Sequence, residues 1–567
     1  MVTLLIRPRY NPFVILEKAI QEIRDRVERD YGFAPAVGEP RQGYGDLAFP
    51  CFEHAAAHKA SPAKAAEEVS RGLVGLKHFE RAEAANGFVS LYFSPAFYAE
   101  ALAEFKEGYA KSNAGKKRKL VIDYSSPNVG KPLHVGHIRS TILGDAFARL
   151  RTHSGWSVTR SNYLCEAGTQ VAMLMVALEE FGIDKVKTER DLLDCYVRIS
   201  KQFKENPALE EKARDALERM ENGDETVWKA LHKVREISLA PVRKNYELLG
   251  IEFDEEIFDS VLVPRSLEIV EEAKKKGIAF KDEHGETVVK LEDYKLPNFI
   301  VLRSNGTTLY STRDLALADE RFEKRAFDEC VYVTASEQNT HFRQVFKTLE
   351  LLGREYAPRL KHVGFGLISI PEGKLSTREG RVLLLEDFLK AAIETAKKEV
   401  RARQDYPDAE ANKIAEQVAI GATKFAVLRV TPEKGIVFNP AEITRFEGHT
   451  GAFLQYSVVR CRGILEKAGR LPAFKAGGEF DEHEKRLCKR LAAFPRVVES
   501  ASRQLQPHQL CDYLLALADD YSAFYANCPV LKAPEADKAK RLALVKATLG
   551  TLEEGLDLLG IQAPEKM

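Results

Sequence analysis

Two histidines three residues apart, His134 and His137, are the side chains whose type and spacing most directly suggest chemistry in this sequence. They stand between KLVIDYSS, which has the composition of a buried strand, and IRSTILGDAFARL, which has the apolar spacing of a helix. The pair is therefore predicted at a helix N-terminus, where free N–H groups and the helix dipole favour an anion. Gly136 lets the backbone approach closely, and imidazoles can donate hydrogen bonds to phosphoryl oxygens, so the segment predicts a nucleotide site.

The histidine pair by itself leaves other interpretations open. Paired histidines also occur in packed cores and in zinc sites, and their spacing does not separate these from a phosphate site. The longer run from Ser125 to Asp145, SSPNVGKPLHVGHIRSTILGD, is more informative. It resembles the HIGH signature of class I aminoacyl-tRNA synthetases, and its SSPN and IRST segments resemble the arginyl-tRNA synthetase version. The resemblance implies that Gly136, His134 and His137 bind ATP, and that both histidines stabilise charge on its phosphates.

A second phosphate-binding segment is expected late in the same fold, and GKLSTREG at residues 373–380 resembles the family's KMSKS loop. Lys374 matches the first lysine of that loop, whereas Thr377 stands in place of the second. The resemblance implies that Lys131 or Arg378 supplies the missing positive charge. An ordinary polar loop is the alternative for this segment. The catalytic residues implied are His134, His137, Lys131 and Lys374, with Ser376 and Arg378 as further ATP contacts.

Binding a planar guanidinium group requires acidic and hydrogen-bond-accepting side chains. In LYSTRDLALADER, residues 309–321, Tyr310 and Asp314 are four apart and share a face if the segment begins a helix. A structural ion pair between Asp314 and a nearby arginine, Arg313 or Arg321, is the alternative. The segment resembles the Y-x-T-R-D motif of arginyl-tRNA synthetases, in which the tyrosine and the aspartate bind the guanidinium of the substrate.

The same resemblance implies further contacts with the amino acid. Gln338, in VYVTASEQNTHFRQVF, matches a substrate-contacting glutamine, and Asp259 matches an acidic position near the guanidinium. The family positions that hold the α-amino and carboxylate groups are matched by Asp123, Ser126 and Asn128. One segment departs from the family: SNYLCEAGTQ stands where N-x-x-G-D-W-G-T-Q is usual, so Glu166 and Ala167 replace Asp-Trp. Because of this departure, the family motif does not predict the shape of that wall of the pocket.

The chain is predicted to be an α/β protein with several parts. Residues 1–113 combine amphipathic helices with short strand-like runs, which favours a small α+β domain. Residues 114–385 alternate strands and helices, as a doubly wound parallel sheet does, with a helical insertion at about 171–250. Residues 386–446 should form a helical connection, and residues 447–567 an all-α domain. The resemblance identifies these parts as an N-terminal tRNA-elbow domain, a Rossmann-like class I catalytic domain and an anticodon-binding domain.

Candidate tRNA contacts come from both ends of the chain. GYGDLAFPCF and NGFVSLYF resemble patterns of the elbow-contacting domain, which makes Phe88 a candidate base contact, although a core phenylalanine is the alternative. EGHTGAFLQYSVVRCRGIL, residues 447–465, is similar to the family's TGPYLQYAxxR and implies tRNA contacts by Gln455, Tyr456 and Arg460. KSNAGKKRK, residues 111–119, is either a phosphate contact or a solvated linker.

Length and composition agree with a multidomain enzyme. The 567 residues suffice for about three to four domains of ordinary size. With 84 basic and 84 acidic residues the chain has no net charge, so nucleic-acid binding must depend on local segregation of charge. The eight cysteines form no C-x-x-C pair, so neither structural zinc nor a disulfide framework is expected. No run fits a signal peptide or a membrane span, which predicts a cytoplasmic protein without a membrane partner.

The motifs follow the order of arginyl-tRNA synthetases over nearly the whole chain. The resemblance implies a monomeric ligase that uses ATP, with Mg²⁺ accompanying the nucleotide, to attach L-arginine to tRNA(Arg). It also implies that activation of arginine requires bound tRNA(Arg). A class I synthetase for another amino acid, such as cysteine or glutamate, is one alternative, and the Tyr310 and Asp314 pair argues against it. A non-catalytic tRNA-binding paralogue is another, and the intact histidines and lysines argue against that.

Overall fold

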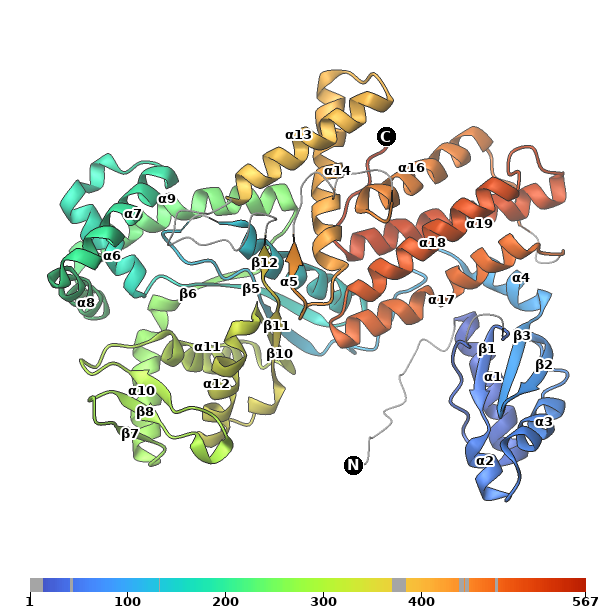
Figure 1. Cartoon of the computed structure of the whole chain (residues 1–567), viewed down its shortest axis with the longest axis horizontal. Coiled ribbons are helices and arrows are strands. Elements are labelled where there is room, and N and C mark those ends of the chain that lie inside the picture. Colours follow the sequence, from blue (N-terminus) through green and yellow to red (C-terminus); the bar gives the residue numbers. More distant parts are fainter. Residues whose placement is uncertain are drawn as a thin grey trace.

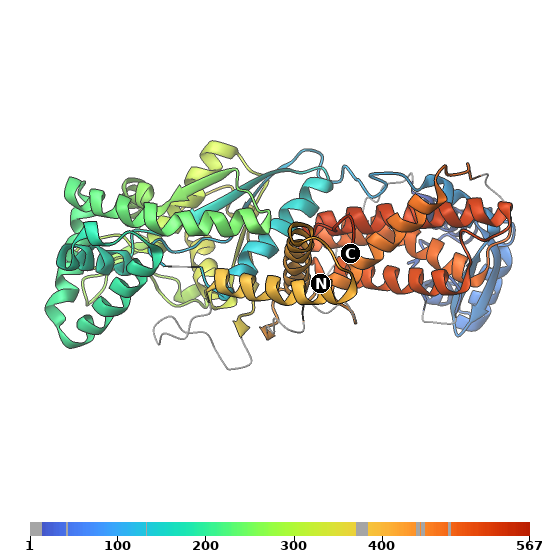
Figure 2. The same cartoon turned by 90° about the horizontal axis from the view of Figure 1, so that it is seen from above.

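The computed structural model describes residues 14–40, 44–131, 133–369, 384–437, 443, 448–474 and 478–567. Figure 1 shows a parallel sheet in the middle of the molecule, with a helical insertion at one end and the C-terminal helices at the other. The N-terminal part lies beside those C-terminal helices in both views (Figures 1 and 2). The two ends of the chain therefore build the same end of the molecule.

The N-terminal part is a three-stranded antiparallel sheet in the order β1-β3-β2, with helices packed against it. α1 buries Ala19, Ile23 and Val27 on one face, because its apolar residues recur at helical spacing. Ser61 and Ser94 cap α3 and α4, and each is followed by a proline. Proline has no N–H group, so it leaves no unbonded donor at the first position of the helix. The elements are α1 (Ile15–Tyr31), β1 (Leu47–Pro50), α2 (Phe52–Ala57), α3 (Pro62–Gly72), β2 (Phe79–Ala85), β3 (Phe88–Phe93) and α4 (Pro95–Glu104).

The central part is built on a five-stranded parallel sheet in the order β11-β10-β4-β5-β6. Its strands are β4 (Lys119–Asp123), β5 (Ser157–Leu164), β6 (Glu255–Phe258), β10 (Glu329–Ala335) and β11 (Leu360–Phe365). From β4 the chain crosses through α5 (Val135–His153) to β5 on one side, whereas the later strand β10 pairs with β4 on the other. The order of the strands thus reverses at β4. In open α/β sheets, ligands bind in the crevice at such a reversal, beyond the carboxyl ends of the strands.

A helical layer is inserted between β5 and β6. It consists of α6 (Thr169–Phe181), η1 (Ile183–Lys185), α7 (Glu189–Glu205), α8 (Pro207–Glu221) and α9 (Glu225–Leu249). These helices have an apolar core of their own, which includes Leu174, Leu192 and Leu231. The last turns of α9 instead place Tyr246 and Leu249 in the main core beside the sheet. The insertion is therefore attached to the sheet through α9.

The second half of the central part carries a small antiparallel sheet, in the order β7-β8-β9, beside the helices that lead into β10 and β11. Its elements are η2 (Asp259–Leu262), α10 (Val263–Lys275), β7 (Ala279–Lys281), β8 (Thr287–Val289), η3 (Glu292–Tyr294), β9 (Phe299–Leu302), α11 (Tyr310–Arg325), η4 (Ser336–Gln338), α12 (Asn339–Leu351) and η5 (Ala357–Arg359). α11 precedes β10, and α12 connects β10 to β11.

The C-terminal third is mainly helical and shares its core with the rest of the chain. Its elements are β12 (Ile368–Ser369), α13 (Leu385–Arg403), α14 (Asp408–Leu428), β13 (Ile436–Val437), α16 (Gly451–Ala468), α17 (Glu482–Gln504), α18 (His508–Asn527) and α19 (Glu535–Leu558). Ile23 of α1, Ile142 of α5 and Leu552 of α19 belong to one buried apolar cluster. Across the described ranges, we find no helix with the length and apolar character needed to cross a bilayer.

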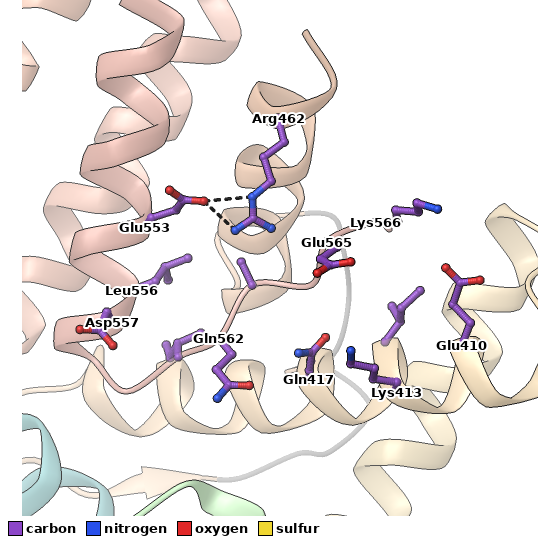
Figure 3. Close-up of a pocket in the computed structure, with 13 residues that line it drawn as sticks. Glu410, Lys413, Gln417, Arg462, Glu553, Leu556, Asp557, Gln562, Glu565 and Lys566 are labelled. Carbon is purple, nitrogen blue, oxygen red and sulfur yellow. Dashed lines mark hydrogen bonds and ion pairs between the residues drawn. The ribbon is translucent and has the colours of Figure 1, made fainter. Parts of the chain in front are cut away.

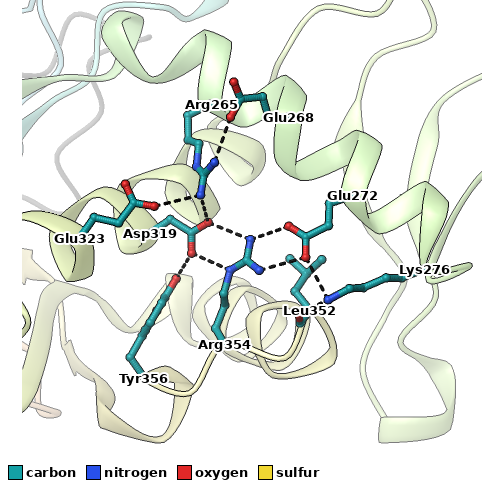
Figure 4. Close-up of polar contacts among 9 residues, drawn as sticks. All are labelled: Arg265, Glu268, Glu272, Lys276, Asp319, Glu323, Leu352, Arg354 and Tyr356. Carbon is teal, nitrogen blue, oxygen red and sulfur yellow. Dashed lines mark hydrogen bonds and ion pairs between the residues drawn. The ribbon is translucent and has the colours of Figure 1, made fainter.

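An ion-pair network holds α10, α11 and the turn after α12 together (Figure 4). Asp319 of α11 accepts hydrogen bonds from Arg354 Nε at 2.8 Å, from Arg265 Nη2 at 3.2 Å and from the Tyr356 hydroxyl. Arg354 also donates to both oxygens of Glu272, at 3.0 and 2.7 Å, and these bonds lower the pKa of Glu272 to about 2. Because Asp319 is buried, its charge depends on these partners.

Replacing Asp319 by alanine is expected to lower the free energy of unfolding by about 3 kcal/mol, because it removes the buried anion that Arg265, Arg354 and Tyr356 share. Glu323→Ala is the control, since Glu323 binds the same Arg265 at 3.0 Å but is exposed, and its loss should cost less than about 1 kcal/mol. Urea unfolding followed by fluorescence measures both, because Trp156 and Trp228 both lie in the central part. Equal effects of the two substitutions would contradict this account of the network.

Candidate active site

The two histidines lie where α5 begins, after the carboxyl end of β4. His134 is the N-cap of α5, and its Nδ1 accepts a hydrogen bond from the Gly136 N–H at 3.0 Å. His137 Nδ1 accepts from the His134 N–H at 3.2 Å, and the two ring centres are 3.9 Å apart. A glycine is required at position 136, because a Cβ there would lie 2.7 Å from His134 Cε1. The segment therefore forms a helix start in which both imidazoles are held by the backbone.

These contacts determine how the imidazoles can act. Because each Nδ1 accepts a backbone N–H, the proton of each neutral ring is assigned to Nε2, which can donate to a ligand. Burial, with a smaller contribution from Lys131, lowers the pKa of His134 to about 4. Burial, together with His134, lowers the pKa of His137 to about 3. Both rings are therefore uncharged at neutral pH in the free protein, and their N–H groups are what they offer to a phosphate.

The zinc alternative for this pair needs further ligands. Within the described ranges, no three or more His, Cys, Asp or Glu side chains are grouped so that they could hold a metal ion. Both Nδ1 atoms are also occupied by backbone N–H groups. The geometry of the pair thus favours a helix-start anion site.

The cations expected beside the phosphates fall only partly within the described residues. Lys131 is half-buried, and its Nζ lies 5.3 Å from the ring centre of Tyr196 on α7. Lys374, Ser376 and Arg378 lie outside the described residues. The backbone that leads toward them is fixed by the buried Arg139 of α5, which donates to the Gly366 carbonyl at 2.8 Å and the Thr431 carbonyl at 3.1 Å.

The turn after β4 has a strained backbone. Ser125 and Ser126 have φ values of 70° and 47°, in the left-handed region that residues other than glycine rarely adopt. Hydrogen bonds hold this conformation, since the Ser125 N–H donates to Ser140 Oγ at 3.0 Å and Ser125 Oγ lies 2.7 Å from the Tyr246 hydroxyl. Ser126 is half-buried and Asn128 is exposed, so both are accessible, and their contacts with the amino acid stay predictions.

Asp123, at the end of β4, does not have the surroundings expected of an amino-acid contact. Its carboxylate is buried and accepts hydrogen bonds from Arg321 Nη1 at 3.2 Å and from Ser126 Oγ at 3.3 Å. Burial raises the pKa of Asp123, and the charge of Arg321 opposes that rise. In the structure Asp123 therefore binds α11 to the sheet and supports the Ser126 turn. Its direct contact with the amino acid stays a prediction.

Tyr310 and Asp314 lie together on the first turns of α11, as their spacing predicts. Tyr310 is 55% exposed, whereas Asp314 is 9% exposed. Asp314 Oδ2 accepts a hydrogen bond from His341 Nε2 of α12 at 2.6 Å. The alternative of an ion pair with a neighbouring arginine is wrong, because Arg313 pairs with Asp259 and Arg321 pairs with Asp123.

Asp259, in η2, is also enclosed by the protein. Its Oδ2 accepts from Arg313 Nε at 2.9 Å, and its Oδ1 accepts from the N–H groups of Glu166 and Ala167 at 2.7 and 2.8 Å. Only 1% of Asp259 is exposed. Its guanidinium partner in the structure is therefore Arg313 of the protein, and the predicted contact with the guanidinium of a substrate stays a prediction. Gln338, in η4, is exposed and can reach a ligand.

The structure explains the position at which Glu166 and Ala167 replace the Asp-Trp of the family motif. Glu166 is completely buried, and Arg235 of the inserted helix α9 donates to it from both Nε, at 2.9 Å, and Nη2. Ser260 Oγ also lies 2.5 Å from Glu166 Oε1. The Arg235 guanidinium stacks over the Phe258 ring at 3.8 Å. This wall of the site is thus an ion pair that joins the insertion to the β5–α6 turn.

The candidate tRNA contacts at the N-terminal part line a cavity. Phe88 is 41% exposed and meets the Phe52 ring edge-on at 5.3 Å. The cavity has a volume of about 560 Å³ and is also lined by Tyr44 and Asn86. Exposed rings beside an amide group can stack on a nucleobase and bond its edge. Phe88 is therefore a surface residue rather than a core residue, and its contact with tRNA stays a prediction.

The C-terminal candidates divide into two kinds. Tyr456 and Arg460 line a cavity of about 720 Å³ with Tyr525, and the Arg460 guanidinium lies 4.8 and 5.4 Å from the two ring centres. Gln455 is instead fully buried, and its Nε2 donates to the carbonyls of Gln417 and Gln562 at 2.9 and 2.6 Å. The side chain therefore joins α16 to α14 and the C-terminal segment, and its predicted contact with tRNA stays a prediction.

A cavity of about 460 Å³ lies between α14, α16, α19 and the C-terminal segment (Figure 3). Side chains of both charges line it, and Arg462 is already bound to Glu553, with Nε at 3.0 Å from Oε1. None of the predicted site residues lines this cavity.

Three side chains near the site were missed by the sequence analysis: His341, Arg313 and Arg235. His341 follows Gln338 by three residues in a segment already assigned to substrate, and that position was the available signal. Arg313 stands inside the Tyr310–Asp314 motif, but its partner Asp259 is 54 residues away in sequence. Arg235 binds Glu166 across 69 residues, and no local pattern indicates such a pair.

Comparisons with known proteins agree with this geometry. Residues 99–439 match the family model for the catalytic domain of class I tRNA synthetases (R), and residues 454–567 match the DALR anticodon binding domain. An arginine–tRNA ligase of Clostridioides difficile is 35% identical, covering 93% of this chain and 94% of that protein. One of Pediococcus pentosaceus is 36% identical, covering 92% and 94%.

Solved structures give the same result for the whole architecture. The Thermus thermophilus arginyl-tRNA synthetase superposes with a TM-score of 0.81 at 26% identity, covering 97% of this chain and 99% of that one. The enzyme from Plasmodium falciparum superposes with a TM-score of 0.82 at 21% identity, which shows the shared fold. The matches thus extend over nearly the whole length of this chain and of its relatives. The chain belongs to the arginine–tRNA ligase family of class I tRNA synthetases.

Proposed function

We propose that this chain activates L-arginine with ATP and transfers it to tRNA(Arg), with release of AMP and diphosphate. The observation that carries the proposal is the position of Tyr310 and Asp314 beside the start of α12. α12 follows β10, α5 follows β4, and these two strands are hydrogen-bonded neighbours in the parallel sheet. An acidic pocket and an anion-binding helix start therefore adjoin the same edge of the sheet, as joining arginine to a phosphate requires.

The first step needs positioning and positive charge rather than a protein nucleophile. The carboxylate of arginine attacks the α-phosphate of ATP and diphosphate leaves, so charge develops on phosphoryl oxygens. His134 and His137 supply N–H donors at the start of α5, and Lys131 supplies a cation beside them. Lys374, Ser376 and Arg378 complete the phosphate site in this proposal. Mg²⁺ would accompany ATP and share the charge of its phosphates.

The amino acid is proposed to lie between α11 and the β4 turn. Asp314 and Tyr310 face the guanidinium, with Gln338 as a further contact. Ser126 and Asn128 remain candidates for the α-amino and carboxylate groups, since both are accessible. An acidic substrate would be repelled by Asp314, and a cysteine enzyme of this class would need a metal for the thiol. The site therefore supports a cationic substrate.

The tRNA is proposed to contact both ends of the chain, with residues 1–113 at its elbow and residues 447–567 at its anticodon. The cavities beside Phe88 and beside Tyr456 and Arg460 support this assignment, because each presents exposed aromatic rings. The domain boundaries at 113, 385 and 446, a monomeric chain and a cytoplasmic location stay predictions of the same proposal. Aminoacylation of unfractionated tRNA with each of the twenty amino acids tests it, and charging with an amino acid other than arginine, or with none, would overturn it.

Asp314→Asn is expected to raise the KM for arginine roughly tenfold to a hundredfold, while the KM for ATP changes little. The reason is the loss of a charge-assisted hydrogen bond, which contributes about 1.5–3 kcal/mol. Steady-state aminoacylation with arginine and ATP varied separately measures both constants. An unchanged KM for arginine would show that the guanidinium binds elsewhere.

Two substitutions of His134 separate its role as the N-cap of α5 from its proposed catalytic role. Asparagine can still accept the Gly136 N–H, so His134→Asn should keep the stability of the protein, whereas His134→Ala should lose about 1 kcal/mol. Both lose the Nε2–H donor, so both should slow adenylate formation by about 10²-fold. Single-turnover kinetics and thermal unfolding measure the two effects. Normal activation in the asparagine variant would refute the phosphate contact.

Activation of arginine is predicted to require bound tRNA(Arg). Deleting residues 447–567 would be a poor test, because Leu454 and Leu552 belong to the core shared with α5. Arg460→Glu leaves that core intact and should weaken tRNA binding roughly tenfold or more by charge repulsion against phosphate. Arginine-dependent ATP–diphosphate exchange should then fall at low tRNA and recover at high tRNA. Strong exchange without any tRNA would show that the coupling is absent.

A further inference from the structure

We infer that His341 is a positioning residue for arginine recognition: it holds one oxygen of Asp314 and supports the ring of Tyr310, so that both face the substrate in a fixed arrangement. This inference rests on the proposed function, because it assumes that Tyr310 and Asp314 bind the guanidinium group. His341 comes from α12, whereas Tyr310 and Asp314 come from α11. The histidine therefore joins the two helices that form the pocket.

The contact between His341 and Asp314 is short and shielded from solvent. His341 Nε2 lies 2.6 Å from Asp314 Oδ2, and only 8% of the histidine and 9% of the aspartate are exposed. A carboxylate can only accept, so Nε2 carries the proton and donates. In the described part of the chain, His341 is the one side chain that bonds to Asp314. The pair is thus a directed hydrogen bond rather than a loose surface contact.

Aromatic rings hold the imidazole in its orientation. The ring centres of Tyr310, Phe342 and Phe299 lie 4.9, 5.2 and 5.7 Å from that of His341. Tyr310 is otherwise exposed, so contact with His341 limits where its hydroxyl can point. Packing on three sides fixes the rotamer of His341, and a fixed donor fixes the carboxylate. The two groups proposed to meet the guanidinium are therefore oriented by the same side chain.

This arrangement has a consequence for specificity. With Oδ2 occupied by His341, Oδ1 is the oxygen of Asp314 left to accept from the substrate, and the Tyr310 hydroxyl is the second acceptor in this inference. A guanidinium has two N–H groups side by side and can meet both acceptors, whereas a lysine ammonium is a compact point charge. Without His341 the carboxylate could rotate, and the spacing of the two acceptors would no longer be defined. The loss should therefore fall on arginine binding, with little effect on ATP.

The test compares His341→Leu with His341→Gln in aminoacylation by the full chain. Leucine fills similar space without a donor and should raise the KM for arginine roughly tenfold, with kcat and the KM for ATP changed less than about twofold. The glutamine amide can occupy the position of Nε2, so His341→Gln should restore most of the affinity. His362→Leu is the matched control, since His362 stacks on Phe342 at 4.5 Å and bonds Thr334 Oγ1 at 2.8 Å.

A double substitution shows whether His341 acts through Asp314. In an Asp314→Asn background, His341→Leu should cause little further loss, because the carboxylate it orients is gone. If the effects of Asp314→Asn and His341→Leu on the KM for arginine were additive, the inference would be overturned. Equal changes in kcat and in both KM values of His341→Leu would also overturn it. If the leucine variant does not fold, His341→Asn replaces it, since its shorter amide cannot reach the position of Nε2. A KM for arginine that is as low in His341→Asn as in His341→Gln would also overturn the inference.

Failure of the proposed function has a different signature. If Asp314→Asn alone leaves the KM for arginine unchanged, the pocket itself is misassigned. If Asp314→Asn impairs arginine binding and His341→Leu does not, the pocket stands and only the positioning role of His341 is lost.

Discussion

Three buried carboxylates, each paired with an arginine, form the wall behind the site, and the positions of the surrounding elements depend on these pairs. Asp123 pairs with Arg321, Asp259 pairs with Arg313, and Glu166 pairs with Arg235. A charge in the protein interior is costly unless a partner of opposite sign meets it in good geometry. Each pair therefore has one arrangement that satisfies it, and any displacement of one helix leaves two charges without partners. These pairs add little net stability, but they define where α11 and α9 must lie against the sheet.

α5 gives the nucleotide site a direct connection to the C-terminal helices. The helix begins at His134, and farther along Arg149 binds Asp145 at 2.8 Å and the Asp557 carboxylate of α19 at 3.5 Å. The buried Lys424 of α14 donates to the Gly560 carbonyl, at 2.6 Å, in the same region. Burial lowers the pKa of Lys424 to about 8, with Asp145 opposing that shift. One helix thus has its N-terminus at the proposed phosphate site and its other end in contact with the C-terminal helices.

Local patterns predicted those parts of the site that depend on neighbouring residues. The strand, turn and helix around His134 follow from residue types within one short segment, and the i, i+4 spacing brings Tyr310 and Asp314 together. The surroundings of Asp123, Asp259 and Gln455 are the part of the site that the motifs could not predict. Their types match a binding role, but burial and a distant partner decide what each does, and neither is visible in a motif. Arg321 is 198 residues from Asp123, and Gln562 is 107 residues from Gln455.

The described residues on both sides of segment 370–383 are hydrogen-bonded near the start of α5. On one side β12 pairs with β13, and on the other Leu384 bridges His134 while the Leu385 N–H donates to the Leu133 carbonyl at 2.9 Å. A chain extends by at most about 3.5 Å per residue, so Lys374 stays within roughly 18 Å of Ser369. In the proposed phosphate site, the length of chain between these two anchors therefore sets the effective concentration of Lys374 at ATP. Inserting residues between the anchors would lower that effective concentration without altering the charge of the lysine.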